Sequence, residues 1–443
     1  MPSLIIQHFE PLCGFLMPLI ALLSQPQQRH ALNVVGALLV CGSKHKCLTT
    51  LTAMLRVAHA DHFALADFFR ASGWCPLEIR RAVLRTQMAV VGRVLREGGE
   101  NLPIYLCVDD SLAVKDAGTS ALEAVSWHHD HVKQRAQMRV KGTTYSKAAR
   151  FVTVTGCVHG LSFPLSWRLY LSSKQVKKLN AKRKTQSKLT FNTLIELVQQ
   201  MLDEIEPQLP KSARVIVLFD SWYASTDLLN DILRRGWQFV CAVKSNRILL
   251  DSSSKSSSKK SLGSPMSAYW RKLSRQRIKR VTTHSTKGSH TYHTRCTTGW
   301  LRGVTTPVVA VFSKRHLRKP HVACFITSDK RLRAQGLLRC YAFRWHCETD
   351  NFLLKERLGL ADFRLHAVEA VHRWFCLVFA AYAFVRIRIA QSWLAQPSQP
   401  VPSFHDVIAE QQTWHLEHLV VFVAHHARNG WSDQQLIAHL LPP

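Results

Sequence analysis

The middle of the chain carries two hydrophobic periods. In several short stretches, apolar residues alternate with polar ones or follow one another directly, which predicts β-strands. In residues 190–206 the apolar residues recur every three or four positions, which predicts a helix. A second helix is predicted near 225–235. The predicted strands cover residues 103–109, 150–158, 162–171, 214–219 and 237–243. Three strands, then a helix and a further strand, predict an α/β core.

The pattern changes after this core. Residues 251–263 are rich in serine and lysine and predict a flexible loop. Strand-like runs then return before long helices are predicted over 330–358 and 364–394. These runs are 291–297, 307–313 and 321–327. We therefore expect a β-rich region inserted into the core, while prolines within 397–402 mark a linker to a short, histidine-rich helical tail.

The net charge narrows the class of partner. Lys and Arg number 59 against 29 Asp and Glu, which gives +30 and a pI near 10.1. Such an excess repels itself in a compact fold and attracts polyanions, so nucleic acid is the expected partner and an anionic membrane surface the alternative. One basic run consists of Lys182, Arg183 and Lys184. These side chains could equally contact DNA phosphates or lie exposed to solvent.

The first hundred residues predict a helical region. Amphipathic stretches cover 45–58, 62–71 and 77–97, with a break at Gly73 and Pro76. Basic residues at the start of the first stretch suit a helix-turn-helix-like DNA reader. A purely structural helical cap is an equal alternative.

Cysteine and histidine patterns do not predict a zinc site. The twelve cysteines form no CxxC pair, and in a chain of this size without a secretory signal we expect reduced thiols. The cluster Trp127-His128-His129-Asp130-His131 contains metal-ligand types, but such clusters are more often loop residues.

The apolar segments do not predict a membrane span. Residues 4–23 contain prolines and charged residues and lack a basic start, so they predict neither a signal peptide nor a span. The run from Trp374 to Val385 is too short to cross a bilayer and predicts a buried helix. We expect a cytoplasmic protein, associated with the nucleoid when bound to DNA.

Acidic residues follow two of the predicted strands. Asp109 and Asp110 close the first strand and Asp220 closes a later one, which is where open α/β sheets place their sites. One such residue is usually a turn former or a cap. Two of them together with Glu348 favour a site, and the sequence leaves open whether Asp109 or Asp110 faces it, because adjacent strand residues point to opposite faces.

Residues 341–355 hold the most informative motif. Tyr341, Arg344, Glu348 and Lys355 fall at helical spacings that place them on one face of a helix. Carboxylate oxygens suit metal ions and Arg or Lys suits phosphate, so the set fits a site that holds both. The alternative is a surface helix in which Arg344 and Glu348 form an ordinary i,i+4 ion pair. Three carboxylates can hold two Mg²⁺ ions for phosphoryl transfer.

These residues resemble a known family. The motif Tyr-x2-Arg-x3-Glu-x6-Lys, with Val108-Asp109-Asp110-Ser111 and Phe219-Asp220-Ser221-Trp222-Tyr223, resembles the DDE transposases of bacterial insertion sequences. The resemblance implies an RNase H-like catalytic core with a β-rich insert. It implies Mg²⁺, with Mn²⁺ as a substitute, held by the catalytic residues Asp109, Asp220 and Glu348. It also implies that Tyr341, Arg344 and Lys355 contact DNA.

The resemblance implies partners and a division of the chain. The partners are double-stranded DNA, as element ends and target, and a second copy in a synaptic complex, with no membrane. The regions are a helical DNA-binding region (1–100), the two parts of the core (101–248 and 329–395), the basic insert (249–328) and a helical tail (396–443). Two alternatives remain: an RNase H-like structure-specific nuclease, and a catalytically inactive DNA-binding protein derived from a transposase.

Overall fold

The described strands form one twelve-stranded mixed sheet. The computed structural model describes residues 9–55, 61–99, 102–119, 121–130, 133–134, 144–251, 263–285 and 288–440. The centre of the sheet has the order β4-β3-β1-β5-β6. These strands are β1 (Ile104–Val114), β3 (Tyr145–Val158), β4 (Leu161–Tyr170), β5 (Val215–Phe219) and β6 (Gln238–Val243). The predicted α/β class and these five strands are confirmed.

Strand β1 organises the sheet through two different pairings. It runs antiparallel to β3 along its whole length and parallel to β5 only from Ile104 to Cys107. Asp109 and Asp110 therefore lie inside β1, and the prediction that they end the strand was wrong. The pairing with β3 keeps β1 extended as far as Val114. The two acidic residues stand instead where the pairing with β5 has ended, so that edge of β1 is open beside them.

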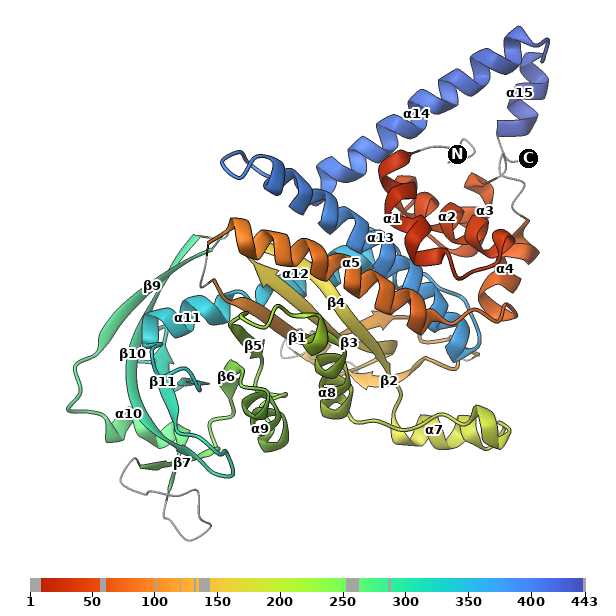
Figure 1. Cartoon of the computed structure of the whole chain (residues 1–443). Coiled ribbons are helices and arrows are strands. Elements are labelled where there is room, and N and C mark those ends of the chain that lie inside the picture. The colour runs from red at the N-terminus through yellow and green to blue at the C-terminus, as the bar shows by residue number, and fades with distance from the viewer. Residues whose placement is uncertain are drawn as a thin grey trace.

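The later strands continue the same sheet. Strand β12 (Ala323–Thr327) pairs antiparallel with β6 and joins the remaining strands to the centre. Figure 1 shows these strands curving away at one end of the molecule. They are β7 (Ile248–Asp251), β8 (Ser264–Pro265), β9 (Lys279–Ser285), β10 (Gly288–Leu301) and β11 (Val308–Lys314). The three strands predicted here are confirmed, whereas most of the predicted loop at 251–263 lies outside the described residues.

Period-two alternation explains why helices cover both faces of the sheet. In β5, Ile216 and Leu218 join one hydrophobic cluster while Val217 and Phe219 join another. The first cluster lies beneath α11 (Ala334–Ala342) and α12 (Trp345–Glu356). On the other face lie α8 (Leu194–Ile205) and α9 (Thr226–Arg234), as Figure 1 shows. The sheet is thus buried on both faces, as its continuous apolar strands require.

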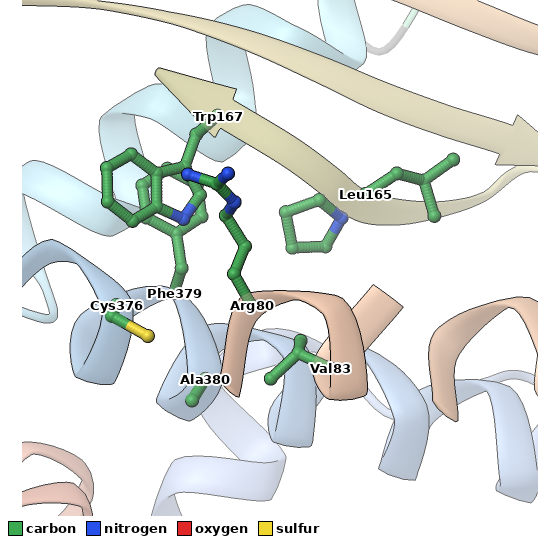
Figure 2. Close-up of a pocket in the computed structure, with 8 residues that line it drawn as sticks. Arg80, Val83, Leu165, Trp167, Cys376, Phe379 and Ala380 are labelled. Atoms are coloured by element: carbon green, nitrogen blue, oxygen red, sulfur yellow. The ribbon is translucent and has the colours of Figure 1, made fainter. Parts of the chain in front are cut away.

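Helix α13 (Val368–Ala395) is the axis of the remaining helices. It packs against β4 and α5 (Pro76–Glu97), and Figure 2 shows a small recess between them in which Arg80 lies over the Trp167 ring, 5.6 Å from its centre. The N-terminal helices also pack around it, and Arg373 donates to the carbonyl oxygens of Phe69 (2.8 Å) and Trp74 (3.2 Å). They are α1 (Glu10–Ile20), α2 (Gln25–Val40), α3 (Leu48–Met54) and α4 (His62–Arg70).

By length and composition, α13 could cross a membrane. It is longer than the apolar run recognised in the sequence, but 83% of its most apolar window is buried inside the protein. Every residue from Trp374 to Val385 is buried, which confirms the predicted core helix. Its apolar character is therefore explained by the elements that surround it.

The C-terminal tail differs from its prediction in length. Helix α14 (Phe404–Arg428) is long, and Figure 1 shows it running away from the sheet toward α15 (Asp433–Leu440). Its buried residues, which end at His415, lie in its first half. The prediction of a short tail was wrong about its length, although Leu416, Leu419, Val420 and Val423 recur at helical spacing in the second half of α14.

Helix α12 is held on the sheet by a buried carboxylate. Asp350 accepts hydrogen bonds from the hydroxyls of Thr155 (3.3 Å), Ser162 (3.0 Å) and Tyr382 (2.7 Å). These donors come from β3, β4 and α13. The network joins four elements and fixes α12 two residues after Glu348, because unpaired buried polar groups would be costly.

The Tyr382→Phe substitution tests this network. Removing a hydrogen bond to a charged group should lower the free energy of unfolding by about 1.5–3 kcal/mol. Tyr292→Phe is the matched control, because the Tyr292 hydroxyl has no hydrogen-bond partner within the described chain, and we expect a change below about 0.5 kcal/mol. Urea unfolding measures both, and equal losses would contradict a structural role for the Asp350 network.

Candidate functional site

The two adjacent aspartates of β1 point to opposite faces of the sheet. Asp109 lies on the face of Tyr105 and Cys107, beneath α11 and α12. Asp110 lies on the face of Leu106 and Val108. The sequence left this choice open because both sets of neighbours are apolar. The helices packed on each face decide it, and Asp109 is the residue that faces the signature motif.

Asp110 is held in a polar network on its own face. The Arg150 guanidinium donates from Nε to Asp110 Oδ2 (2.7 Å), and the Tyr223 hydroxyl donates to Asp110 Oδ1 (2.8 Å). Burial raises the pKa of Tyr223 well above its usual value, with the Asp110 charge adding to the effect. Both carboxylate oxygens of Asp110 thus have side-chain partners on this face of the sheet.

The same network ties the two acidic strands together. Tyr223 follows Asp220 by three residues, and its hydrogen bond to Asp110 links the loop after β5 to β1. Asp220 itself ends β5 as predicted, and its Oδ1 accepts from the Trp222 backbone N–H (2.8 Å). The spacing between Asp109 and Asp220 is therefore set by a fixed contact as well as by strand pairing.

Arg344 joins Glu348 to Asp109. Its guanidinium donates from Nη1 to Asp109 Oδ2 (3.2 Å) and from Nη2 to Glu348 Oε1. It also lies 5.7 Å from the centre of the Tyr341 ring. The side chain is 13% exposed. The i,i+4 pair that an ordinary surface helix would show is present, but a third partner from the sheet makes it part of a buried cluster.

The signature residues do not lie on one continuous helix, as the sequence predicted. Helix α11 ends at Ala342 and α12 begins at Trp345, with backbone N–H groups of Phe343 and Arg344 bonding three residues back (3.1 Å each). This tighter winding separates the two helices while Tyr341 remains beside Arg344. The local spacing of the motif survives, although the predicted helix over 330–358 is divided.

The charges of the site are strongly coupled. Burial raises the pKa of Asp109 to about 7; Arg344 opposes the shift, and repulsion from Asp110, Asp220 and Glu348 adds to it. The charges of Asp220 and Glu348 therefore act on Asp109. Burial alone would lower the pKa of Arg344, but Tyr341 and the carboxylates raise it above its ordinary value. The Arg344 cation beside Asp109 favours the ionised form of this carboxyl group.

Lys355 completes the set at the far end of α12. Its Nζ lies 3.5 Å from the Leu112 carbonyl oxygen of β1. Burial lowers its pKa, whereas Glu356, Asp130 and Asp109 act in the opposite direction. Burial also raises the pKa of Tyr341 to about 12. Direct contacts thus join Asp109, Arg344, Glu348 and Tyr341, whereas Asp220 and Lys355 are linked to Asp109 through their charges.

The donor chemistry of this cluster fits a hard divalent cation. Carboxylate oxygens from two strands and a helix are the ligands that Mg²⁺ prefers. In the part of the chain that the structure describes, no three acidic, histidine or cysteine side chains already lie as a coordinating group. Arg344 stands between Asp109 and Glu348, so its guanidinium supplies the positive charge there.

The histidine cluster around residue 128 is not part of this site. Trp127, His128 and His129 lie in β2 (Ser126–His129), which pairs with β3 and was not predicted as a strand. The buried His128 ring is bonded to the Ser126 hydroxyl (2.9 Å), and burial lowers its pKa to about 4. His131 lies outside the described residues. His128 and His129 therefore belong to a paired strand of the sheet.

Two residues of the site were missed from the sequence. Tyr223 belongs to the block after Asp220, and its nearness to an acidic motif was an available signal. Arg150 had no such signal. It reaches Asp110 because the antiparallel register places Arg150 opposite Leu112, and only the β1–β3 pairing supplies that register.

Comparison with known proteins identifies a family for most of the chain. The sequence profile described as DDE superfamily endonuclease matches residues 18–306. This stretch includes Asp109 and Asp220 and ends before the Tyr341–Lys355 motif. No curated protein matches the chain.

A double-mutant cycle tests the link between the two strands. Tyr223→Phe removes the donor of one buried hydrogen bond and Asp110→Ala removes its acceptor. We therefore expect their effects on unfolding free energy to be coupled by about 1–2 kcal/mol. Combining Tyr223→Phe with Asp406→Asn on α14, where no partner is shared, should be additive within about 0.5 kcal/mol. Additivity in the first pair, measured by chemical denaturation, would contradict the link.

Proposed function

We propose, from the premise that this chain belongs to the DDE superfamily endonuclease family, that it is a DNA transposase of an insertion sequence. It would bind the terminal inverted repeats of its element, hydrolyse a phosphodiester at each end and join the freed 3′-OH to target DNA. The observation that carries the proposal is that Arg344 of the signature motif bridges Asp109 of β1 and Glu348, with the charge of Asp220 acting on Asp109.

The strand order supports an RNase H-like core. Its five strands have the order β4-β3-β1-β5-β6, with β3 antiparallel to β1 and with β5 and β6 parallel to it. In this proposal residues 101–248 and 329–395 form the core, and residues 249–328 are the inserted basic region. Residues 1–100 contribute to DNA binding, and residues 396–443 form the tail.

The residues of the site have distinct proposed roles. Asp109, Asp220 and Glu348 would hold Mg²⁺, or Mn²⁺ in its place. When bound, the metal activates the attacking oxygen and stabilises the leaving oxygen. Arg344 balances the carboxylate charges in the DNA-free chain and, with Lys355, would contact phosphates near the cleavage point. Tyr341, packed against Arg344, would orient that part of the DNA backbone.

The setting of the reaction follows from this proposal. Two element ends must be held together before joining, so we propose a homodimer in a synaptic complex. We also propose a cytoplasmic location, where the chain meets DNA directly. No membrane partner is needed, because the apolar helix α13 is covered by the protein itself.

The first experiment measures cleavage and joining together. Labelled DNA with the flanking repeats is incubated with the purified chain and an unrelated plasmid, in Mg²⁺ or in EDTA. We expect nicking and joined product only with metal, and neither from Glu348→Ala. Joined product from Glu348→Ala would refute the assigned site. Cleavage without joining would indicate a structure-specific nuclease, and tight binding without cleavage an inactive transposase derivative.

A matched pair of neighbouring substitutions tests which aspartate serves the reaction. Asp109→Asn should reduce cleavage by on the order of a thousandfold, because a metal ligand is lost. Asp110→Asn should retain much more activity, since its amide oxygen can still accept from Tyr223. Rates on the same labelled DNA give the comparison, and the reverse ranking would transfer the metal role to Asp110.

Metal binding and DNA binding should also be separable. Asp220→Ala should abolish cleavage while the affinity for repeat DNA, measured by gel shift, stays within a few-fold of wild type. This is expected because the substitution removes the negative charge of Asp220 but no residue that is proposed to contact DNA. Loss of DNA binding in a folded Asp220→Ala chain would argue against a metal-only role for this residue.

A further inference from the structure

A lysine-rich segment stands out on the surface beyond the site. It spans residues 172–190 and contains α7 (Ser173–Asn180) and the 3₁₀ turn η2 (Thr185–Ser187); we call it the α7 segment. Figure 1 shows α7 at the periphery of the molecule. All six of its lysines are exposed, and it contains no acidic residue. They are Lys174, Lys177, Lys178, Lys182, Lys184 and Lys188.

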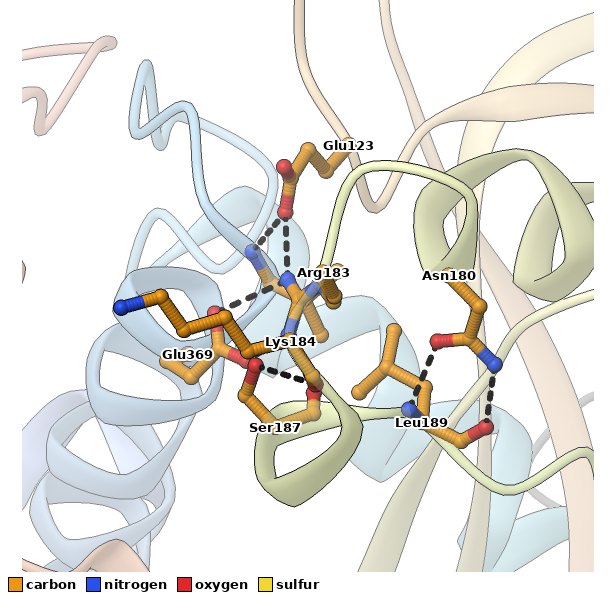
Figure 3. Close-up of polar contacts among 8 residues, drawn as sticks. Glu123, Asn180, Arg183, Lys184, Ser187, Leu189 and Glu369 are labelled. Carbon is orange, nitrogen blue, oxygen red and sulfur yellow. Dashed lines mark hydrogen bonds and ion pairs between the residues drawn. The ribbon is translucent and has the colours of Figure 1, made fainter.

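The segment is anchored to the core by an arginine. Arg183 forms ion pairs with Glu123 (2.9 Å) and with Glu369, in the first turn of α13, as Figure 3 shows. The sequence left Lys182, Arg183 and Lys184 undecided between phosphate and solvent. The structure separates them: the Arg183 guanidinium is engaged inside the protein, and the two lysines beside it are exposed.

Further contacts fix the shape of the segment. The Asn180 side chain donates to the Leu189 carbonyl oxygen and accepts from the Leu189 N–H, both at 2.8 Å (Figure 3). Val176 is buried, and Gln175 donates to the Glu123 carbonyl oxygen. The lysines are thus carried on a backbone with a defined position, which distinguishes the segment from an unstructured basic run.

The charge of the segment is not balanced within the chain. Its six lysines form no ion pair with any residue that the structure describes. Holding like charges together on a fixed support costs free energy that an anionic partner would recover. Lys174, Lys177 and Lys178 lie at helical spacings on one side of α7, so three ammonium groups face the same way.

A DNA backbone suits this surface better than a lipid surface does. A membrane-binding helix inserts an apolar face between the lipids. In α7 the apolar residues Val176 and Leu179 instead pack toward the protein. The helix is roughly 12 Å long, which corresponds to about seven phosphate charges of duplex DNA.

We propose that the α7 segment is a second DNA-contacting surface, which holds the phosphate backbone of duplex DNA outside the cleavage site. The inference rests on the proposed function and adds to it a place where DNA is gripped without being cut. Contacts of this kind carry no sequence information, so the surface would hold any duplex.

Salt dependence of binding by the full chain tests the proposal. The probe is a labelled duplex of unrelated sequence, titrated over a range of NaCl without divalent metal. In the triple variant Lys174→Gln, Lys177→Gln, Lys178→Gln, we expect the slope of log K against log salt to fall by about 3 and binding to weaken roughly 10–100-fold. The control triple, Lys211→Gln, Lys319→Gln and Lys330→Gln, removes the same charge from exposed positions elsewhere and should leave the slope near wild type.

Each other outcome has a defined meaning. Equal changes in the two triple variants would overturn the proposal, because net charge alone would then explain binding. If the Lys174, Lys177, Lys178 triple variant binds duplex DNA as wild type does but no longer binds phosphatidylserine vesicles, the surface binds lipid. That result would also overturn the proposal. A wild-type chain that binds no duplex would overturn the proposed function as well, whereas wild-type binding and cleavage with an inert α7 segment would overturn this inference alone.

Discussion

The site depends on one strand, β1, having both faces buried. Because side chains alternate along a strand, its two consecutive aspartates must enter different environments. The face that carries Tyr105 and Cys107 packs against α11 and α12. The face that carries Leu106 and Val108 belongs to the second, larger hydrophobic cluster. Asp109 therefore bonds to Arg344, which also bonds to Glu348. Asp110 bonds to Tyr223 and to Arg150, which the register with β3 brings to it.

Charge compensation follows from that geometry. Several carboxylates meet where water has little access, so each needs a cation or a hydrogen-bond donor. Arg150 and Tyr223 satisfy Asp110 permanently, because both its oxygens are bonded to protein groups. Arg344 serves Asp109 and Glu348 in the absence of other cations. The two aspartates thus differ in their partners: Asp110 is bonded to groups of its own face, whereas Asp109 is bonded to the signature motif through Arg344.

The arginines and lysines named here have different positions and partners in the structure. Most of the described ion pairs that join separate elements are made by arginine. Examples are Arg80 and Arg168 on Glu204, and Arg183 on Glu123 and Glu369. A planar guanidinium can serve two carboxylates at once, whereas the ammonium of lysine is strongly hydrated. The lysines of the α7 segment accordingly stay at the surface, where they can meet a polyanion. Within the net charge of +30, these arginines stabilise contacts inside the protein, whereas the lysines of the α7 segment remain exposed.

The sequence by itself determined the elements and the chemistry whose signals are local. Alternation and helical period were enough for the central strands, α8, α9 and the buried helix α13, and residue type and spacing were enough for the Tyr341–Lys355 motif. Local patterns could not show the break between α11 and α12, because it depends on a few tightened backbone bonds. They also missed β2, whose strand character comes from pairing with β3.

Only the tertiary structure decided which side chains meet. Parity along β1 was equally consistent with Asp109 and Asp110, and the choice required the helices packed on each face. Arg150 reaches Asp110, forty residues away, only through strand register. Arg183 is a half-buried anchor, whereas its neighbours Lys182 and Lys184 are exposed, because Glu123 and Glu369 are brought to it from distant parts of the chain. Periodicity reports the face on which a residue lies, but the partner on that face is set by long-range packing, which a local pattern does not contain.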